Sequence, residues 1–102
     1  EWDQVQQVRE KVAEELAELD EAVADNEQEA IEAELGDVLF SLVNYARFLN
    51  VDPEQALEKT NQKFIRRFQQ MESIADAAGK KLHDMNLEEM DALWNRAKEI
   101  EN

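Results

Sequence analysis

Residues 2–24 read WDQVQQVREKVAEELAELDEAVA, and the repeat within this stretch indicates the fold class. Its larger apolar residues recur at steps of three and four, which is the pattern of an amphipathic helix. These residues are Val5, Val8, Val12, Leu16, Leu19 and Val23. The 102-residue chain has only 2 glycines and 1 proline, too few turn residues for an all-β sandwich. The sequence therefore predicts an all-α protein.

Two more helices are expected in the middle of the chain. Asn26 is predicted to cap a helix that continues to about Leu49, with its side-chain oxygen accepting a backbone N–H. Asp52 followed by Pro53 is typical of a helix start, with the aspartate as cap and the proline in the first turn. Gly79 is expected to end this third helix in a left-handed conformation.

A fourth helix is expected at the end of the chain, after a loop over residues 80–85. Asn86 and Glu89 have the spacing of a capping box, and the apolar repeat continues from there to Ile100. No internal repeat or low-complexity linker interrupts the pattern. We therefore predict a four-helix, bundle-like architecture in one domain covering residues 1–102, and its small core would gain from self-association.

The charge of the chain excludes several classes of protein. It carries 25 acidic and 11 basic residues, a net charge of −14, which disfavours binding to nucleic acid polymers. No apolar run is long enough for a membrane span, and the absence of cysteine excludes disulfides and thiolate chemistry. Without a signal-like start, a cytoplasmic location is expected. Because the chain begins with Glu1 instead of Met, we expect it to be a piece of a longer protein.

Acidic residues are concentrated in the first two predicted helices. Residues 1–37 hold 14 acidic residues against 2 basic ones. Two pairs have the three-residue spacing that puts both side chains on one helix face: Glu15 with Glu18, and Glu34 with Asp37. If the two helices form an antiparallel hairpin, these four carboxylates converge beside the core.

Four converged carboxylates repel one another and call for a bound cation. Oxygen ligands suit Mg²⁺, and also Mn²⁺, since both ions prefer hard donors and keep positions open for water or phosphate. A di-iron centre of the ferritin kind would need histidines on the helices, whereas the one histidine, His83, lies in the predicted loop.

Basic and aromatic residues of the last two predicted helices could contact an anionic ligand. Lys63 and Arg67 lie four residues apart, where they could either bind phosphate oxygens or pair with neighbouring acids. Trp94 could stack on a nucleobase or belong to the core, and Lys98 shares its helix face. No glycine-rich phosphate loop is present, which excludes P-loop chemistry.

These motifs together resemble a known family. EExxE at residues 14–18 and ExxD at residues 34–37 match the signature of the all-α nucleoside triphosphate pyrophosphohydrolases. The opening EWD at residues 1–3 and the ending after Trp94 resemble the C-terminal domain of a two-domain MazG, and the surrounding blocks resemble bacterial MazG proteins. The blocks are KVAEE at 11–15, ELGDVLF at 34–40, VNYAR at 43–47 and NQKFIRRF at 61–68.

The resemblance implies hydrolysis of nucleoside triphosphates between the α and β phosphates, with Mg²⁺ as cofactor and a homodimer or higher homo-oligomer as the assembly. The metal ligands it implies are Glu15, Glu18, Glu34 and Asp37. The nucleotide or phosphate contacts it implies are Lys11, Lys63, Arg67, Trp94 and Lys98. Glu15 and Glu18 are both candidates for the residue that takes the proton from the attacking water.

Two other functions compete with this hypothesis. One is a non-catalytic helical domain that dimerises through Phe40, Tyr45 or Phe48, while its acids only keep it in solution. The other is a regulatory domain that binds nucleotides without turnover. The spacing of acids and bases argues against the first, and the presence of all four ligand carboxylates argues against the second.

Overall fold

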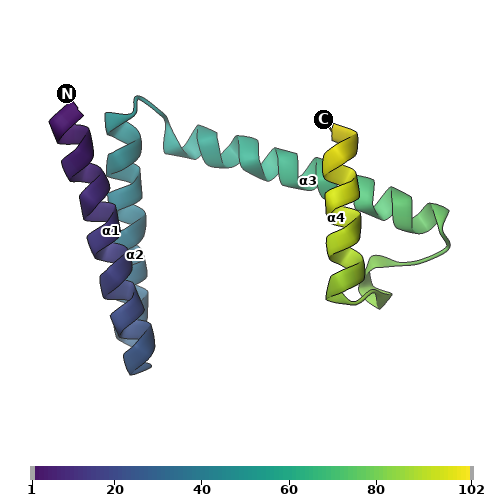
Figure 1. The fold of residues 1–102 in the computed structure, drawn as a ribbon, viewed down its shortest axis with the longest axis horizontal. Coiled ribbons are helices and arrows are strands. Elements are labelled where there is room, and N and C mark those ends of the chain that lie inside the picture. Colours follow the sequence, from purple (N-terminus) through teal and green to yellow (C-terminus); the bar gives the residue numbers. More distant parts are fainter. Residues whose placement is uncertain (1, 102) are drawn as a thin grey trace. The chain divides into compact units, whose positions relative to one another are not determined.

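The computed structural model describes residues 2–101 and contains four α-helices and one short 3₁₀ helix (Figure 1). The elements are α1 (Trp2–Asp25), α2 (Gln28–Phe48), α3 (Pro53–Ala77), η1 (Leu82–Asp84) and α4 (Leu87–Glu101). No strand occurs among the residues described. The predicted all-α fold with four helices is confirmed. The chain divides into two compact units, residues 1–56 and residues 57–102, and each is considered by itself.

In the first unit, α1 and α2 lie side by side as an antiparallel hairpin (Figure 1). The buried residues on the facing sides of the two helices form what we call the hairpin seam. They are Val12, Glu15 and Ala22 on α1 and Val38 and Ser41 on α2. Leu16 and Val23, which share the apolar repeat of α1, are exposed instead. A helix with one packing partner buries only a narrow stripe, so part of a wider apolar face stays uncovered.

The turn between α1 and α2 corrects the predicted role of Asn26. This residue has a positive φ of 56° and ends α1; its N–H donates to Val23 O at 3.0 Å, and the N–H of Glu27 donates to Ala22 O at 3.5 Å. That pair of bonds is a Schellman ending, which asparagine tolerates because it adopts the left-handed conformation more readily than most residues. Glu27 occupies the cap position of α2 and makes no side-chain capping bond. The prediction that Asn26 caps α2 is therefore wrong.

The predicted boundaries of α3 are confirmed. Asp52 Oδ1 accepts hydrogen bonds from the backbone N–H groups of Glu54 at 2.9 Å and Gln55 at 3.3 Å. Gly79 follows the end of α3 with a φ of 73°, a conformation that suits glycine because it has no Cβ.

The capping box at the start of α4 is also confirmed. The N–H of Glu89 donates to Asn86 Oδ1 at 2.8 Å, and the N–H of Asn86 donates to Glu89 Oε1 at 3.3 Å. Within the second unit, Met71 and Ala75 of α3 and Ala97 of α4 are buried. None of the helices in the described range is long and apolar enough to cross a membrane.

Replacing the cap of α3 tests how much the helix start contributes to stability. We expect Asp52→Ala to lower the free energy of unfolding by about 1 kcal/mol, since two backbone N–H groups lose their acceptor. Urea unfolding followed by circular dichroism measures this loss. Asp52→Asn keeps an acceptor oxygen and should lose much less. An alanine variant as stable as the asparagine variant would contradict the capping role.

Candidate metal centre

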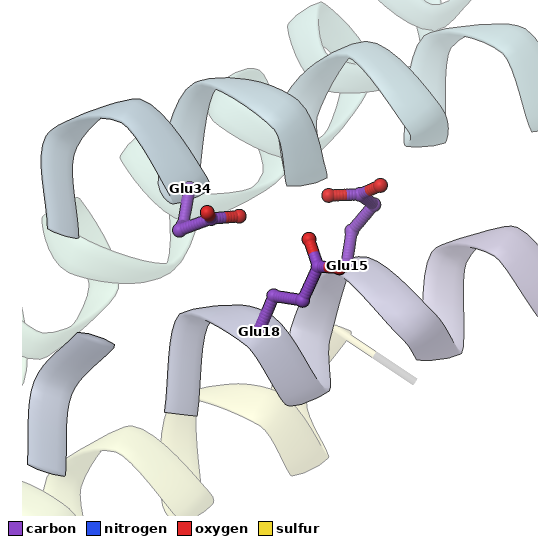
Figure 2. A group of neighbouring side chains, drawn as sticks. All are labelled: Glu15, Glu18 and Glu34. Atoms are coloured by element: carbon purple, nitrogen blue, oxygen red, sulfur yellow. The ribbon is translucent and has the colours of Figure 1, made fainter. Parts of the chain in front are cut away.

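Three carboxylates from the two helices of the first unit converge at one point (Figure 2). Glu15 and Glu18 come from α1 and Glu34 comes from α2. One oxygen of each lies within 4.8 Å of the others. We call these three residues the carboxylate cluster. The structure thus brings together three of the four acids that the sequence spacing predicted to converge.

The helical repeat of the hairpin explains the position of the cluster. Glu15 follows Val12 by three residues and precedes Leu19 by four, so it occupies a position in the stripe that packs on α2. Glu34 precedes Val38 by four residues and occupies the matching stripe of α2. Glu15 is therefore only 7% exposed, although it is charged, and Glu34 is half-buried.

Two buried oxygens of the cluster have no hydrogen-bond partner among the residues described. Glu15 Oε2 and Glu34 Oε2 are buried, and neither accepts a hydrogen bond from any residue described. A buried carboxylate oxygen without a partner is costly, and a cation is the group that compensates it best. The donor set contains only carboxylate oxygens, which fits Mg²⁺ or Mn²⁺. The residues present therefore fit the divalent metal that the sequence predicts.

The electrostatics of the cluster reflect crowded negative charge. The charge on Glu15 raises the pKa of the Glu18 carboxyl above its usual range, and the charge on Glu34 adds to this effect. Glu18 is exposed, so solvent reaches this edge of the cluster.

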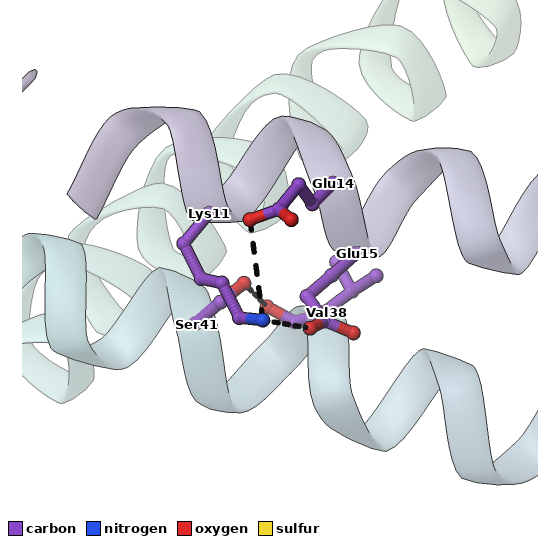
Figure 3. A network of polar contacts seen from close by, with 5 residues as sticks. All are labelled: Lys11, Glu14, Glu15, Val38 and Ser41. Carbon is purple, nitrogen blue, oxygen red and sulfur yellow. Dashed lines mark hydrogen bonds and ion pairs between the residues drawn. The ribbon is translucent and has the colours of Figure 1, made fainter. Parts of the chain in front are cut away.

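A lysine one turn earlier on α1 partly balances this charge (Figure 3). Lys11 Nζ lies 3.1 Å from Glu15 Oε1 and 4.0 Å from Glu14 Oε2. The hydrogen bond to Glu15 is the main cause that raises the pKa of Lys11. This ion pair was not predicted from the sequence, although the four-residue spacing of Lys11 and Glu15 was a signal for it.

The sequence alone did not show which of Asp37 and Ser41 lies in the hairpin seam. Asp37, the fourth predicted ligand, is exposed and lies outside the carboxylate cluster. The stripe of α2 continues from Glu34 to Val38 and Ser41, so Asp37 falls beside it. Ser41 is buried, and its hydroxyl donates to Val38 O at 2.8 Å. A role of Asp37 as metal ligand stays a prediction.

The predicted phosphate- and base-contacting residues lie in the second unit. Arg67 is buried, and its guanidinium carbon lies 4.6 Å from the ring centroid of Trp94, a cation–π arrangement. The ring of Phe64 lies 5.1 Å from that of Trp94. Lys63 and Lys98 are exposed. Trp94 also faces an open groove of about 350 Å³, lined mainly by apolar residues of α3 and α4. The indole of Trp94 is thus partly buried and partly exposed to solvent.

Removing one charge from the cluster should stabilise the metal-free protein. We expect Glu18→Gln to raise the melting temperature in the presence of chelator, because it relieves repulsion by Glu15 and Glu34. A carboxyl with a raised pKa in the folded state costs stability as the pH rises above its unfolded value of 4.5. The gain should therefore be present near neutral pH, shrink as the pH falls through the raised pKa of Glu18 in the folded state, and be absent below 4.5.

Glu21→Gln serves as the matched control for this measurement, since Glu21 is exposed on the same helix and outside the cluster. Thermal unfolding of both variants and of the unmodified chain in chelator makes the comparison. A Glu18→Gln variant that gains no more than the Glu21→Gln variant would show that the cluster is not under electrostatic strain.

A known protein family and several known proteins are similar to this chain. A family model described as the MazG nucleotide pyrophosphohydrolase domain matches residues 3–72. A Thermotoga maritima protein named nucleoside triphosphate pyrophosphohydrolase/pyrophosphatase MazG is 46% identical over 97 residues, which is 95% of this chain and 37% of that protein. The Escherichia coli K12 nucleoside triphosphate pyrophosphohydrolase is 41% identical over 97 residues, again 95% of this chain and 36% of the relative.

A third relative, the uncharacterized protein YabN of Bacillus subtilis, is 56% identical over 71 residues, which is 70% of this chain and 14% of YabN. The chain thus spans little more than a third of the Thermotoga and Escherichia proteins, and less of YabN. The family model covers well over half of the chain and contains all three residues of the carboxylate cluster. The chain belongs to the MazG nucleotide pyrophosphohydrolase domain family.

Proposed function

We propose that this chain hydrolyses nucleoside triphosphates between the α and β phosphates, releasing a nucleoside monophosphate and pyrophosphate, with Mg²⁺ or Mn²⁺ as cofactor. The observation that carries the proposal is the carboxylate cluster, in which two buried oxygens have no hydrogen-bond partner among the described residues. The names of the Thermotoga and Escherichia relatives agree with this reaction class. Because the substrates belong to the nucleotide pool, we place the activity in the cytoplasm.

In this proposal the carboxylate cluster binds the metal, and one of its carboxylates accepts the proton of the attacking water. Glu15 and Glu34 would bind the cation through their unpartnered oxygens, with Glu18 and Asp37 completing the ligand set. A bound divalent cation would neutralise phosphate oxygens and lower the pKa of a water molecule. Glu15 and Glu18 are the candidates for the proton acceptor, and the exposure of Glu18 favours it, since water reaches its carboxylate.

The basic residues of the second unit are proposed to bind the triphosphate. Lys63 and Lys98 offer exposed ammonium groups as point charges. The contact with the Trp94 ring orients the Arg67 guanidinium, so less side-chain freedom would be lost when Arg67 binds an anion. Trp94 would contact the nucleoside.

Substitution of one cluster residue tests the reaction. We expect Glu34→Gln to reduce pyrophosphate release by on the order of 10²-fold or more, because the metal supplies several kcal/mol of charge stabilisation in the transition state. The assay measures pyrophosphate and monophosphate from a panel of ribo- and deoxyribonucleoside triphosphates, with Mg²⁺ and with chelator. Glu32→Gln, an exposed position on the same helix, is the charge-matched control and should keep full activity.

Other outcomes of this assay distinguish the competing functions. Orthophosphate in place of pyrophosphate would show that a different bond is cleaved. No turnover, but a melting temperature raised by Mg²⁺ and nucleotide, would identify a regulatory nucleotide-binding domain. Full Mg²⁺-dependent activity in Glu34→Gln would exclude the cluster as the metal centre.

We also propose that the chain associates with a second copy through α2. Outside the hairpin seam, this helix exposes large apolar residues, and Leu49 directly after it is exposed as well. The residues are Leu35, Leu39, Phe40, Leu42, Val43, Phe48 and Leu49. The side chain of Phe40 is 76% exposed and that of Leu39 is 57% exposed. Several exposed large apolar side chains on one helix favour an interaction site, and a matching helix of a second copy offers the same chemistry.

A single charged substitution tests this association. We expect Phe40→Asp to shift the chain from an oligomer towards the monomer, because burying the new carboxylate in an apolar contact is costly. Size-exclusion chromatography with light scattering measures the mass. Leu87→Asp, at an exposed apolar position on α4, introduces the same charge away from α2 and should leave the mass unchanged. A monomeric unmodified chain would contradict the proposal.

A further inference from the structure

The ammonium group of Lys11 contacts Glu15, one of the three residues of the carboxylate cluster (Figure 3). Its Nζ contacts Glu15 Oε1 at 3.1 Å, while its distance to Glu14 Oε2 is 4.0 Å. Glu15 is almost fully buried, so its ion pair with Lys11 is less screened by solvent than a pair between two exposed side chains. Lys11 is therefore the cation that the protein itself supplies to this carboxylate.

Lys11 compensates the cluster only in part. One ammonium charge faces three carboxylates, and it contacts Oε1 of Glu15 while the buried Oε2 atoms of Glu15 and Glu34 have no partner among the described residues. The lysine side chain is 58% exposed, so water surrounds much of it. The negative charge that Lys11 leaves uncompensated could be balanced by a divalent cation. That cation would share Glu15 with the ammonium group of Lys11.

We propose that Lys11 is an internal counter-ion that competes with the divalent metal for Glu15 and turns to the substrate triphosphate once the metal is bound. This inference rests on the proposed function. A metal ion on Glu15 repels the nearby ammonium group, and the flexible stem of Lys11 allows it to move to the nearest new anion. Metal binding and triphosphate binding would then assist each other, because such coupling is reciprocal.

Metal binding without substrate tests the first half of the proposal. Mn²⁺ is titrated into the complete 102-residue chain and its dissociation constant is measured by calorimetry, without nucleotide. We expect Lys11→Met to bind Mn²⁺ tighter by roughly threefold or more, the scale at which a partly exposed ion pair competes. Lys11→Arg keeps the competing charge and should show no such gain. Arg9→Gln removes an exposed positive charge from the same helix and should stay close to the unmodified chain.

Nucleotide binding tests the second half. A non-hydrolysable α,β-methylene nucleoside triphosphate is titrated with and without Mn²⁺. In the unmodified chain Mn²⁺ should increase the affinity for this probe, and in Lys11→Met the increase should be smaller. A Lys11→Met variant that binds Mn²⁺ equally or more weakly than the unmodified chain would overturn the counter-ion role, as would an unchanged increase in probe affinity.

The unmodified chain and Glu34→Gln separate this inference from the proposed function. If the unmodified chain binds no Mn²⁺, or if Glu34→Gln binds it equally well, the metal centre itself is wrong. If the unmodified chain binds Mn²⁺ through Glu34 but Lys11→Met shows no gain, the metal centre stands and only the role of Lys11 falls.

Discussion

Repulsion between carboxylates held at the packed face of a helical hairpin is the constraint on which this structure depends. Glu15 takes a position in the hairpin seam that a hydrophobic residue would otherwise fill, and Glu34 faces it from α2. Both positions give up apolar burial and add electrostatic cost, so they weaken the hairpin that contains them. A cation bound at this site would stabilise the folded state and so offset the electrostatic cost of the two carboxylates.

The helix boundaries could be predicted where a side chain has one clear capping role. Asp52, Gly79 and the Asn86–Glu89 pair act as their spacing indicates. Asn26 was misassigned because asparagine suits both the cap of a following helix and the left-handed end of a preceding one. Only the path of the chain after Asp25 decides between these two roles, and local sequence does not contain it.

The candidate site could be predicted less completely than the fold. Three-residue spacing paired Glu15 with Glu18, since it fixes which side chains share a helix face, and the expected antiparallel hairpin brought Glu34 to them. Spacing alone did not separate Asp37 from these residues. The next buried residue of α2 after Glu34 is Val38, four positions later, and Asp37 is exposed beside it. Nor does spacing within one helix reveal which apolar residues will lack a partner, as the exposure of Leu16 shows.

The left-handed conformation of Asn26 also fixes the phase of one helix against the other. Only Asn26 and Glu27 lie between the last residue of α1 and the first of α2. A connection this short cannot accommodate an inserted or deleted residue without moving one helix relative to the other. Inserting or deleting one residue near the start of α2 would rotate the rest of that helix by about 100° relative to α1. Glu34 would then leave the seam. The length of this turn therefore decides whether Glu34 reaches the carboxylate cluster.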